Sequence, residues 1–206
     1  MTFQLFDCAQ NSPEWFAARC GLPTASNFSA ILAKGEGKTR KSYLNKLAAE
    51  IITGEPGESF TTQAMERGRE MEAEARDLYE FLTDETMYEV GFIKSGDKGA
   101  SPDRLVGPNG GLEIKTQRGD LLVETLLANK FPSEHKAQVQ GNLWVCEREW
   151  WDLVVYWPRM PMFRIRAYRD EAYIANLAAE VARFNADLHE TVSLIRRYGK
   201  AEAIAA

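Results

Sequence analysis

Short strand-like segments fill the middle of the chain, and longer helical segments lie on both sides of them. Segments 87–94, 100–106 and 111–116 are rich in β-branched or aromatic residues, and the glycine-containing turns GDKG and GPNGG separate them. We expect these segments to form three successive antiparallel strands. Two further strands are predicted at 151–157 and 162–168. The pattern indicates an α/β (α+β) fold with a central mixed β-sheet flanked by helices.

Apolar residues at helical spacing predict the helices. In segment 62–82, Glu72 shares a helix face with Ala75 and Tyr79. Taken alone, Glu72 is more simply interpreted as a carboxylate at the exposed rim of that helix. The other predicted helices are 12–19, with Ser12 and Pro13 at its start; a segment from Thr24 or Ser26 through Leu32; 42–53, ending at Gly54; 133–146, capped by Ser133; and 170–198, ending at Gly199.

Length and composition favour one compact domain over residues 1–206, since 206 residues with 45% hydrophobic content can bury a sizeable core. The three cysteines are an odd number, widely separated, and show no CxxC spacing. The N-terminus lacks a signal-peptide pattern, and no apolar run approaches the length of a membrane span. We therefore expect a cytoplasmic protein without membrane association.

The formal net charge of −5 argues weakly against a polyanionic partner, but the basic residues are unevenly distributed. Five of them occur between residues 34 and 46, against a single Glu36: Lys34, Lys38, Arg40, Lys41 and Lys46. The segment is either a patch that faces phosphates or a solvated loop followed by a helix start.

The segment 111–116 places two opposite charges on one strand face. Because side chains alternate along a strand, Glu113 and Lys115 share one face, while the apolar residues beside them share the other, core-facing side. Asp103 lies on the preceding strand, and the turn at 107–111 folds the chain back. The carboxylates of Asp103 and Glu113 should therefore approach each other on the side away from the core.

Two carboxylates held close together repel each other, and a hard divalent cation with oxygen ligands usually relieves that repulsion. Adding Glu72 gives three carboxylates, whose charge two Mg²⁺ ions balance once a phosphodiester contributes another negative charge. The pattern D-x9-E-x-K therefore favours phosphoryl transfer, with Lys115 orienting the nucleophile or offsetting charge at phosphorus. By itself the pattern also occurs by chance in many globular chains.

Other catalytic arrangements are poorly represented. Only His135 and His189 are available, and the chain contains no HExxH helix, GxSxG elbow or glycine-rich phosphate loop. His189 is interpreted as structural.

Four ordered blocks of the sequence resemble one known family. The blocks SPEWFAARCGLPTAS, GREMEAEAR, SPDRLVGPNGGLEIKT and HKAQVQGNLWV are similar to the YqaJ-type viral recombinases, also called the phage lambda exonuclease family. This family belongs to the PD-(D/E)xK nuclease superfamily. The resemblance covers most of the chain, and the motif is present in its literal form.

The resemblance implies a role for each matching position. Asp103, Glu113 and the main-chain carbonyl of Ile114 would bind metal, Glu72 would complete the site, and Lys115 would be the catalytic lysine. Gln138 matches a glutamine that arranges water and metal. The implied cofactor is Mg²⁺, two per site, with Mn²⁺ as a substitute. Residues of an implied 5′-phosphate pocket are Arg19, Ser26 and Ser101.

Two departures from the family pattern concern the role of His135, which stands where a tyrosine is found, and the segment from Lys34 to Arg40, which is shorter.

The family also implies an activity and an assembly. Its members form a ring of three subunits around duplex DNA, degrade one strand 5′ to 3′ processively, and leave a 3′ single strand for an annealing protein. In such a ring the candidate DNA-binding residues Lys34, Lys38, Arg40 and Lys41 would face the channel. Two alternatives are an endonuclease of the same superfamily and a non-catalytic scaffold that binds DNA ends. An iron–sulfur nuclease is disfavoured, because four suitably spaced cysteines are absent from the sequence.

Overall fold

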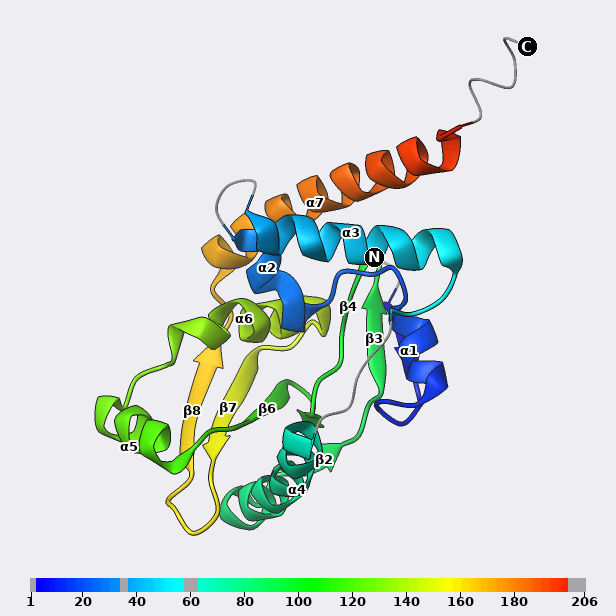
Figure 1. Cartoon of the computed structure of the whole chain (residues 1–206). Helices are drawn as coiled ribbons and strands as arrows, with labels where there is room; N and C mark the ends of the chain where they lie inside the picture. Colours follow the sequence, from blue (N-terminus) through cyan, green and yellow to red (C-terminus); the bar gives the residue numbers. More distant parts are fainter. Residues whose placement is uncertain (1–2, 34–36, 58–62, 200–206) are drawn as a thin grey trace, which may run out of the picture.

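Two β-sheets form the centre of the molecule, and helices surround them (Figure 1). The computed structural model describes residues 3–33, 37–57 and 63–199. The larger sheet has five strands in the order β2-β5-β6-β7-β8, and the smaller has three in the order β1-β3-β4. Strand β6 pairs antiparallel with β5 and parallel with β7, so the larger sheet is mixed. The predicted fold class is confirmed.

The strands are β1 (Phe3–Phe6), β2 (Met87–Tyr88), β3 (Phe92–Ser95), β4 (Lys98–Ala100), β5 (Arg104–Val106), β6 (Gly110–Thr116), β7 (Trp150–Tyr156) and β8 (Phe163–Tyr168). The helices are α1 (Pro13–Arg19), α2 (Phe28–Leu32), α3 (Lys38–Thr53), α4 (Gln63–Thr83), α5 (Gly119–Ala128), α6 (Lys136–Val145) and α7 (Glu171–Arg197), with short 3-10 turns η1 (Ala25–Asn27) and η2 (Ser133–His135).

The prediction of three successive antiparallel strands is wrong, because the chain changes sheets twice in that region. Segment 87–94 is divided between β2 and β3, and segment 100–106 between β4 and β5. The first change occurs at Gly91, where a Cβ atom would lie 2.1 Å from the main-chain oxygen of Cys8. The second occurs at Pro102, which has no N–H to donate to a sheet. Close backbone approach and a missing donor thus interrupt the pairing.

Several predicted helix ends are confirmed, and one is wrong. The Ser12 side chain accepts a hydrogen bond from the main-chain N–H of Trp15, and Gly54 ends α3 in the left-handed region. Ser133 does not cap α6, because it is the first residue of η2 and the helix begins only at Lys136. Helix α3 begins four residues earlier than expected, at Lys38. Strand β1 and helix α5 were not predicted.

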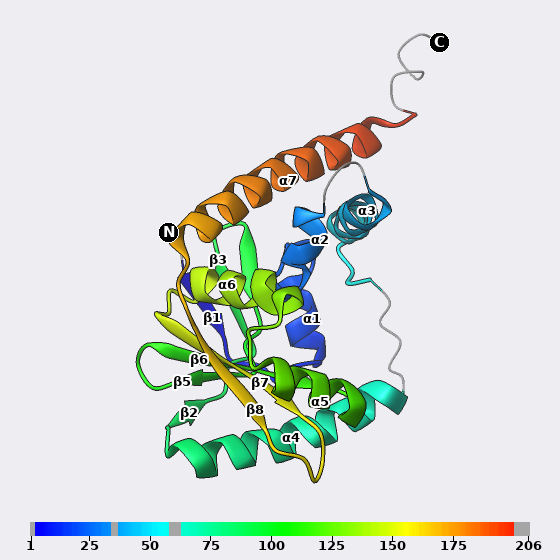
Figure 2. The ribbon, with the colours of Figure 1, turned by 90° about the vertical axis from the view of Figure 1, so that its left-hand side faces the viewer.

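Helices cover both faces of the larger sheet (Figure 2). Met71, Ala75 and Tyr79 of α4 pack against Leu112 and other apolar residues on one face. Helix α6 lies over the other face, and beyond it α2, α3 and α7 contribute to the main core. The connection between the parallel strands β6 and β7 runs through α5 and α6. The helix α6 is thereby placed directly over β6.

Over residues 3–33, 37–57 and 63–199, no helix combines the length and apolar character needed to cross a membrane.

Two helix glycines provide a test of the packing beneath α6. A Cβ atom at Gly141 of α6 would lie 2.5 Å from the ring of Phe28, which is fully buried, whereas one at Gly68 of α4 would meet only Thr116 Oγ1 at 3.7 Å. Gly141→Ala should lower the free energy of unfolding by about 1–3 kcal/mol through overpacking. Gly68→Ala should raise it by up to about 1 kcal/mol through helix propensity. Denaturant unfolding measures both, and equal effects would contradict the packing described here.

Candidate active site

Glu113 of β6 is a buried carboxylate with a full set of hydrogen-bond donors. The residue is 3% exposed. Its Oε1 accepts from Lys115 Nζ at 2.7 Å and from Gln138 Nε2 at 2.5 Å, and its Oε2 accepts from Asn142 Nδ2 at 3.0 Å. Gln138 and Asn142 both belong to α6. The expectation that this strand face lies away from the core is therefore wrong, because α6 covers it.

Asp103 lies immediately before β5 and is held by the neighbouring strand. Its Oδ2 accepts a hydrogen bond of 2.6 Å from the main-chain N–H of Ile114. Burial raises the pKa of Asp103 well above its ordinary value, and the charges of Glu113 and Glu72 raise it further. The predicted approach of Asp103 to Glu113 is thus present, and the two carboxylates repel each other.

Glu72 extends toward the same place from α4 and is half-buried. Burial raises its pKa, the charge of Glu113 adds to that effect, and the charges of Arg104, Arg76 and Lys115 oppose it. The structure therefore places Glu72 beside the strand carboxylates, and its interpretation as an isolated rim residue does not fit.

Lys115 is the cation among these carboxylates. Burial by itself would lower its pKa, but the charge of Glu113 and its hydrogen bond, together with Asp103 and Glu72, raise the pKa above the ordinary value. Lys115 thus carries a stable positive charge at the centre of an acidic site.

The donor chemistry of this site fits a hard divalent cation, since three carboxylates face a single ammonium group and oxygen ligands are what Mg²⁺ prefers. Within the described part of the chain, no three His, Cys, Asp or Glu side chains converge closely enough to form a ready-made metal centre. Glu113 is already hydrogen-bonded to Lys115, Gln138 and Asn142. Ion binding here would therefore require Glu113 to exchange a donor.

Two residues of α6 add to the predicted set. Asn142 was not singled out from the sequence, although it lies one helical turn after Gln138 and therefore on the same helix face. His135 lies close enough to Lys115 for the lysine charge to lower its pKa, in addition to the larger effect of burial. The family's tyrosine position is thus occupied here by a half-buried imidazole near the catalytic lysine candidate.

A second cluster forms around Arg19. Its Nη1 donates to Ser101 Oγ at 3.0 Å, and its guanidinium lies 3.8 Å from the centroid of the Trp15 ring. Trp15 Nε1 donates to Ser101 Oγ as well, also at 3.0 Å. Ser26 is not joined to this pair. It is exposed, and its Oγ is within hydrogen-bond distance of Thr24 and Asn27, two residues that line the same pocket as Arg19.

The candidate DNA-binding residues are not brought together as one patch. Lys34 lies outside the described residues, while Lys38 and Lys41 are exposed at the start of α3. Arg40 pairs with Asp187 of α7 at 2.7 Å and lies over the ring of Phe184. Arg40 is thus already engaged in joining α3 to α7.

The sequence and the fold both match known proteins. Residues 14–149 match the YqaJ-like viral recombinase domain. The chain belongs to this family. No curated protein sequence matches it.

Solved structures of exonucleases share the YqaJ-like fold of this chain. LHK-Exo in complex with dAMP is 36% identical, with a TM-score of 0.85 over 94% of this chain and 100% of that one. The alkaline exonuclease LHK-Exo from Laribacter hongkongensis is 35% identical with a TM-score of 0.83 over the same shares. A phage-related exonuclease from Haemophilus somnus 129PT is 13% identical, with a TM-score of 0.64 over 84% of this chain and 96% of that one, and shows the fold alone.

The hydrogen bond from Asn142 to Glu113 can be tested by a double-mutant cycle. Asn142→Leu should lower the free energy of unfolding by about 1–3 kcal/mol, because it leaves a buried carboxylate oxygen without its donor. In a Glu113→Gln background the same change should cost less, since no charged acceptor remains. Denaturant unfolding of the four proteins gives the coupling energy. An equal loss in both backgrounds would show that the bond is not responsible.

Proposed function

We propose that this protein is a Mg²⁺-dependent deoxyribonuclease, an exonuclease that digests one strand of duplex DNA 5′ to 3′ from a phosphorylated end. The single observation that carries the proposal is the convergence of Asp103, Glu113 and Glu72 on Lys115. Membership of a viral recombinase family and the likeness to proteins described as exonucleases support the same reaction class.

Asp103, Glu113, Glu72 and the main-chain carbonyl of Ile114 are the groups that would hold the metal, and Mn²⁺ should substitute for Mg²⁺ because it accepts the same oxygen ligands. Bound there, such ions supply activation of water and stabilisation of charge on the leaving oxygen.

The protein's own residues position the reaction. The main-chain N–H of Ile114 fixes the Asp103 carboxylate, and the side chains of Gln138 and Asn142 fix that of Glu113. Lys115 can donate a proton of its ammonium group in a hydrogen bond to a phosphate oxygen, where negative charge increases in the transition state. Because Gln138 shares Glu113 Oε1 with Lys115, its amide is also placed to hold a water molecule beside that oxygen.

The 5′ end would be recognised by Arg19 and Ser101, whose side chains are hydrogen-bonded together, with Ser26 contributing through its hydroxyl. Guanidinium and hydroxyl donors suit a terminal phosphate.

Assembly and partners complete the proposal. From the family resemblance we infer a homotrimeric ring around duplex DNA in the cytoplasm, and a single-strand annealing protein that receives the 3′ strand. Lys34, Lys38, Arg40 and Lys41 would contact the DNA backbone. Encirclement would supply processivity despite the overall net charge of −5.

Removal of the catalytic lysine tests the mechanism. Lys115→Ala should lower kcat by about 100- to 1000-fold while binding to DNA ends is kept, because the charge acts mainly on the transition state. Lys94→Ala, which removes a lysine from β3 in the smaller sheet, serves as the control and should keep full activity. Unchanged kcat in Lys115→Ala would show that the assignment of Lys115 is wrong.

The substrate class is tested with linear duplexes carrying 5′-phosphate, 5′-hydroxyl or closed ends, and with covalently closed circles, each with and without Mg²⁺. We expect digestion of linear duplexes from the 5′-phosphate end, only with the metal, and inert circles. Cutting of circles would favour an endonuclease, and binding of ends without any digestion would favour a scaffold.

A further inference from the structure

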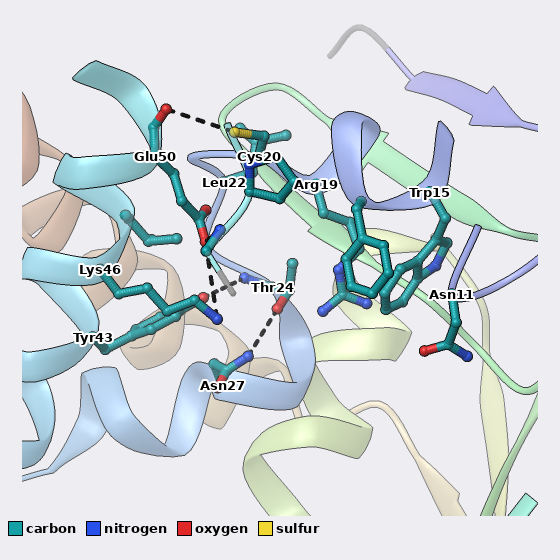
Figure 3. Close-up of a pocket in the computed structure, with 14 residues that line it drawn as sticks. Asn11, Trp15, Arg19, Cys20, Leu22, Thr24, Asn27, Tyr43, Lys46 and Glu50 are labelled. Atoms are coloured by element: carbon teal, nitrogen blue, oxygen red, sulfur yellow. Dashed lines mark hydrogen bonds and ion pairs between the residues drawn. The ribbon is translucent and has the colours of Figure 1, made fainter. Parts of the chain in front are cut away.

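A pocket of about 230 Å³ lies between α1 and α3, beside the residues that would recognise a 5′ end (Figure 3). Arg19 lines it from the end of α1, Thr24 and Asn27 line it from the segment that follows, and Lys46 and Glu50 line it from α3. The pocket is thus larger than the Arg19 and Ser101 pair alone and has a second wall formed by α3.

Arg19 is a largely enclosed cation in this pocket. Burial lowers its pKa to about 10, which reflects the loss of solvation around the guanidinium. Its contacts are the hydroxyl of Ser101 and the face of the Trp15 ring, and within the described ranges it forms no ion pair with a carboxylate. A cation removed from water without a paired anion is costly, so this guanidinium is suited to an incoming anion.

Glu50 is the carboxylate that lines the pocket, but its oxygens are directed at the main chain. Its Oε2 accepts from the N–H of Gly21 at 2.8 Å, and its Oε1 accepts from the N–H of Gly57 at 3.2 Å. The residue is 7% exposed, which limits its freedom to turn toward the pocket centre. Glu50 therefore fixes the two segments that border the pocket and leaves Arg19 without a counter-ion.

Lys46 is a second cation on the pocket, and it is weakly held. Its Nζ lies 3.9 Å from Glu50 Oε1, at the outer limit for an ion pair, and its side chain is 58% exposed. Figure 3 shows Lys46 and Arg19 extending from opposite walls, with Thr24 between them. The four-carbon stem of a lysine is flexible enough to bring its ammonium group to a ligand in this space.

We propose that Lys46 is a specificity-determining residue that contacts the terminal 5′-phosphate opposite Arg19 and sets the preference for a phosphorylated end. A terminal phosphate monoester carries up to two negative charges, whereas each internal phosphodiester carries one. Two cations on opposite walls therefore match a terminal phosphate better than an internal one. This inference rests on the proposed exonuclease function and extends it to α3.

The test compares kcat/KM for linear duplexes with a 5′-phosphate and with a 5′-hydroxyl. Lys46→Ala should reduce the ratio of the two values about 3- to 10-fold, mainly through KM for the phosphorylated duplex, because the lysine acts in binding. Lys46→Arg should retain most of the ratio, since the charge is kept. Lys94→Ala removes the same charge from the distant strand β3 and should leave the ratio unchanged. The midpoint of thermal unfolding should stay constant, because an exposed pair at i,i+4 contributes little.

An unchanged ratio in Lys46→Ala, or an equal reduction in Lys94→Ala, would overturn the inference while the nuclease assignment stands. Equal digestion of both ends by the wild-type protein would remove the phosphate pocket, and Lys46 with it. If the wild-type protein digests neither duplex, the proposed function fails. The affinities of both duplexes, measured without divalent metal, then decide on Lys46: a selective loss for the 5′-phosphorylated duplex in Lys46→Ala supports it, and no loss contradicts it.

Discussion

The burial of Glu113 between β6 and α6 is the constraint on which the rest of the site depends. A carboxylate that is 3% exposed is tolerated only when donors surround it, and here a lysine and two amides do so. Those amides come from a helix that the β6-to-β7 connection places over the sheet. The parallel pairing of β6 with β7 and the hydrogen bonding of Glu113 are therefore parts of one arrangement.

The same helix separates the two functions of the molecule. Gln138 and Asn142 of α6 face the carboxylates, whereas Gly141 faces Phe28 and so lets α2 and its preceding turn approach closely. That turn continues from the segment that carries Arg19 and Thr24. The distance between the chemistry and the recognition of the DNA end is thus determined by how tightly α6 packs on both sides.

The local features of the fold were predictable from the sequence, and the long-range ones were not. Alternation along 111–116 correctly placed Glu113 and Lys115 on one face, and Ser12 and Gly54 correctly marked helix ends. The change of sheet at Gly91 was hidden, because a glycine in a strand pattern does not reveal which backbone approaches it. The buried position of Glu113 was also missed, since its cover, α6, is more than twenty residues away in the sequence.

Candidate site residues followed the same division. The motif identified Asp103, Glu113 and Lys115, and the family resemblance added Glu72 and Gln138, all of which the structure brings together. Asn142 and Lys46 carried no motif, because their significance comes from what faces them in space. Arg40 was interpreted only as a basic residue, and its pairing with Asp187 depends on the docking of α3 against α7.

Helix α3 has one face on the pocket and the other against the last helix. Tyr43 lies on the pocket lining and also stacks on Phe184 of α7, with ring centroids 5.5 Å apart and planes 24° from parallel. The C-terminal helix therefore acts as a rigid support for the wall that carries Lys46. Shortening the protein from its C-terminal end into that helix would alter substrate selection before it altered bond cleavage, although no residue of α7 belongs to either site described.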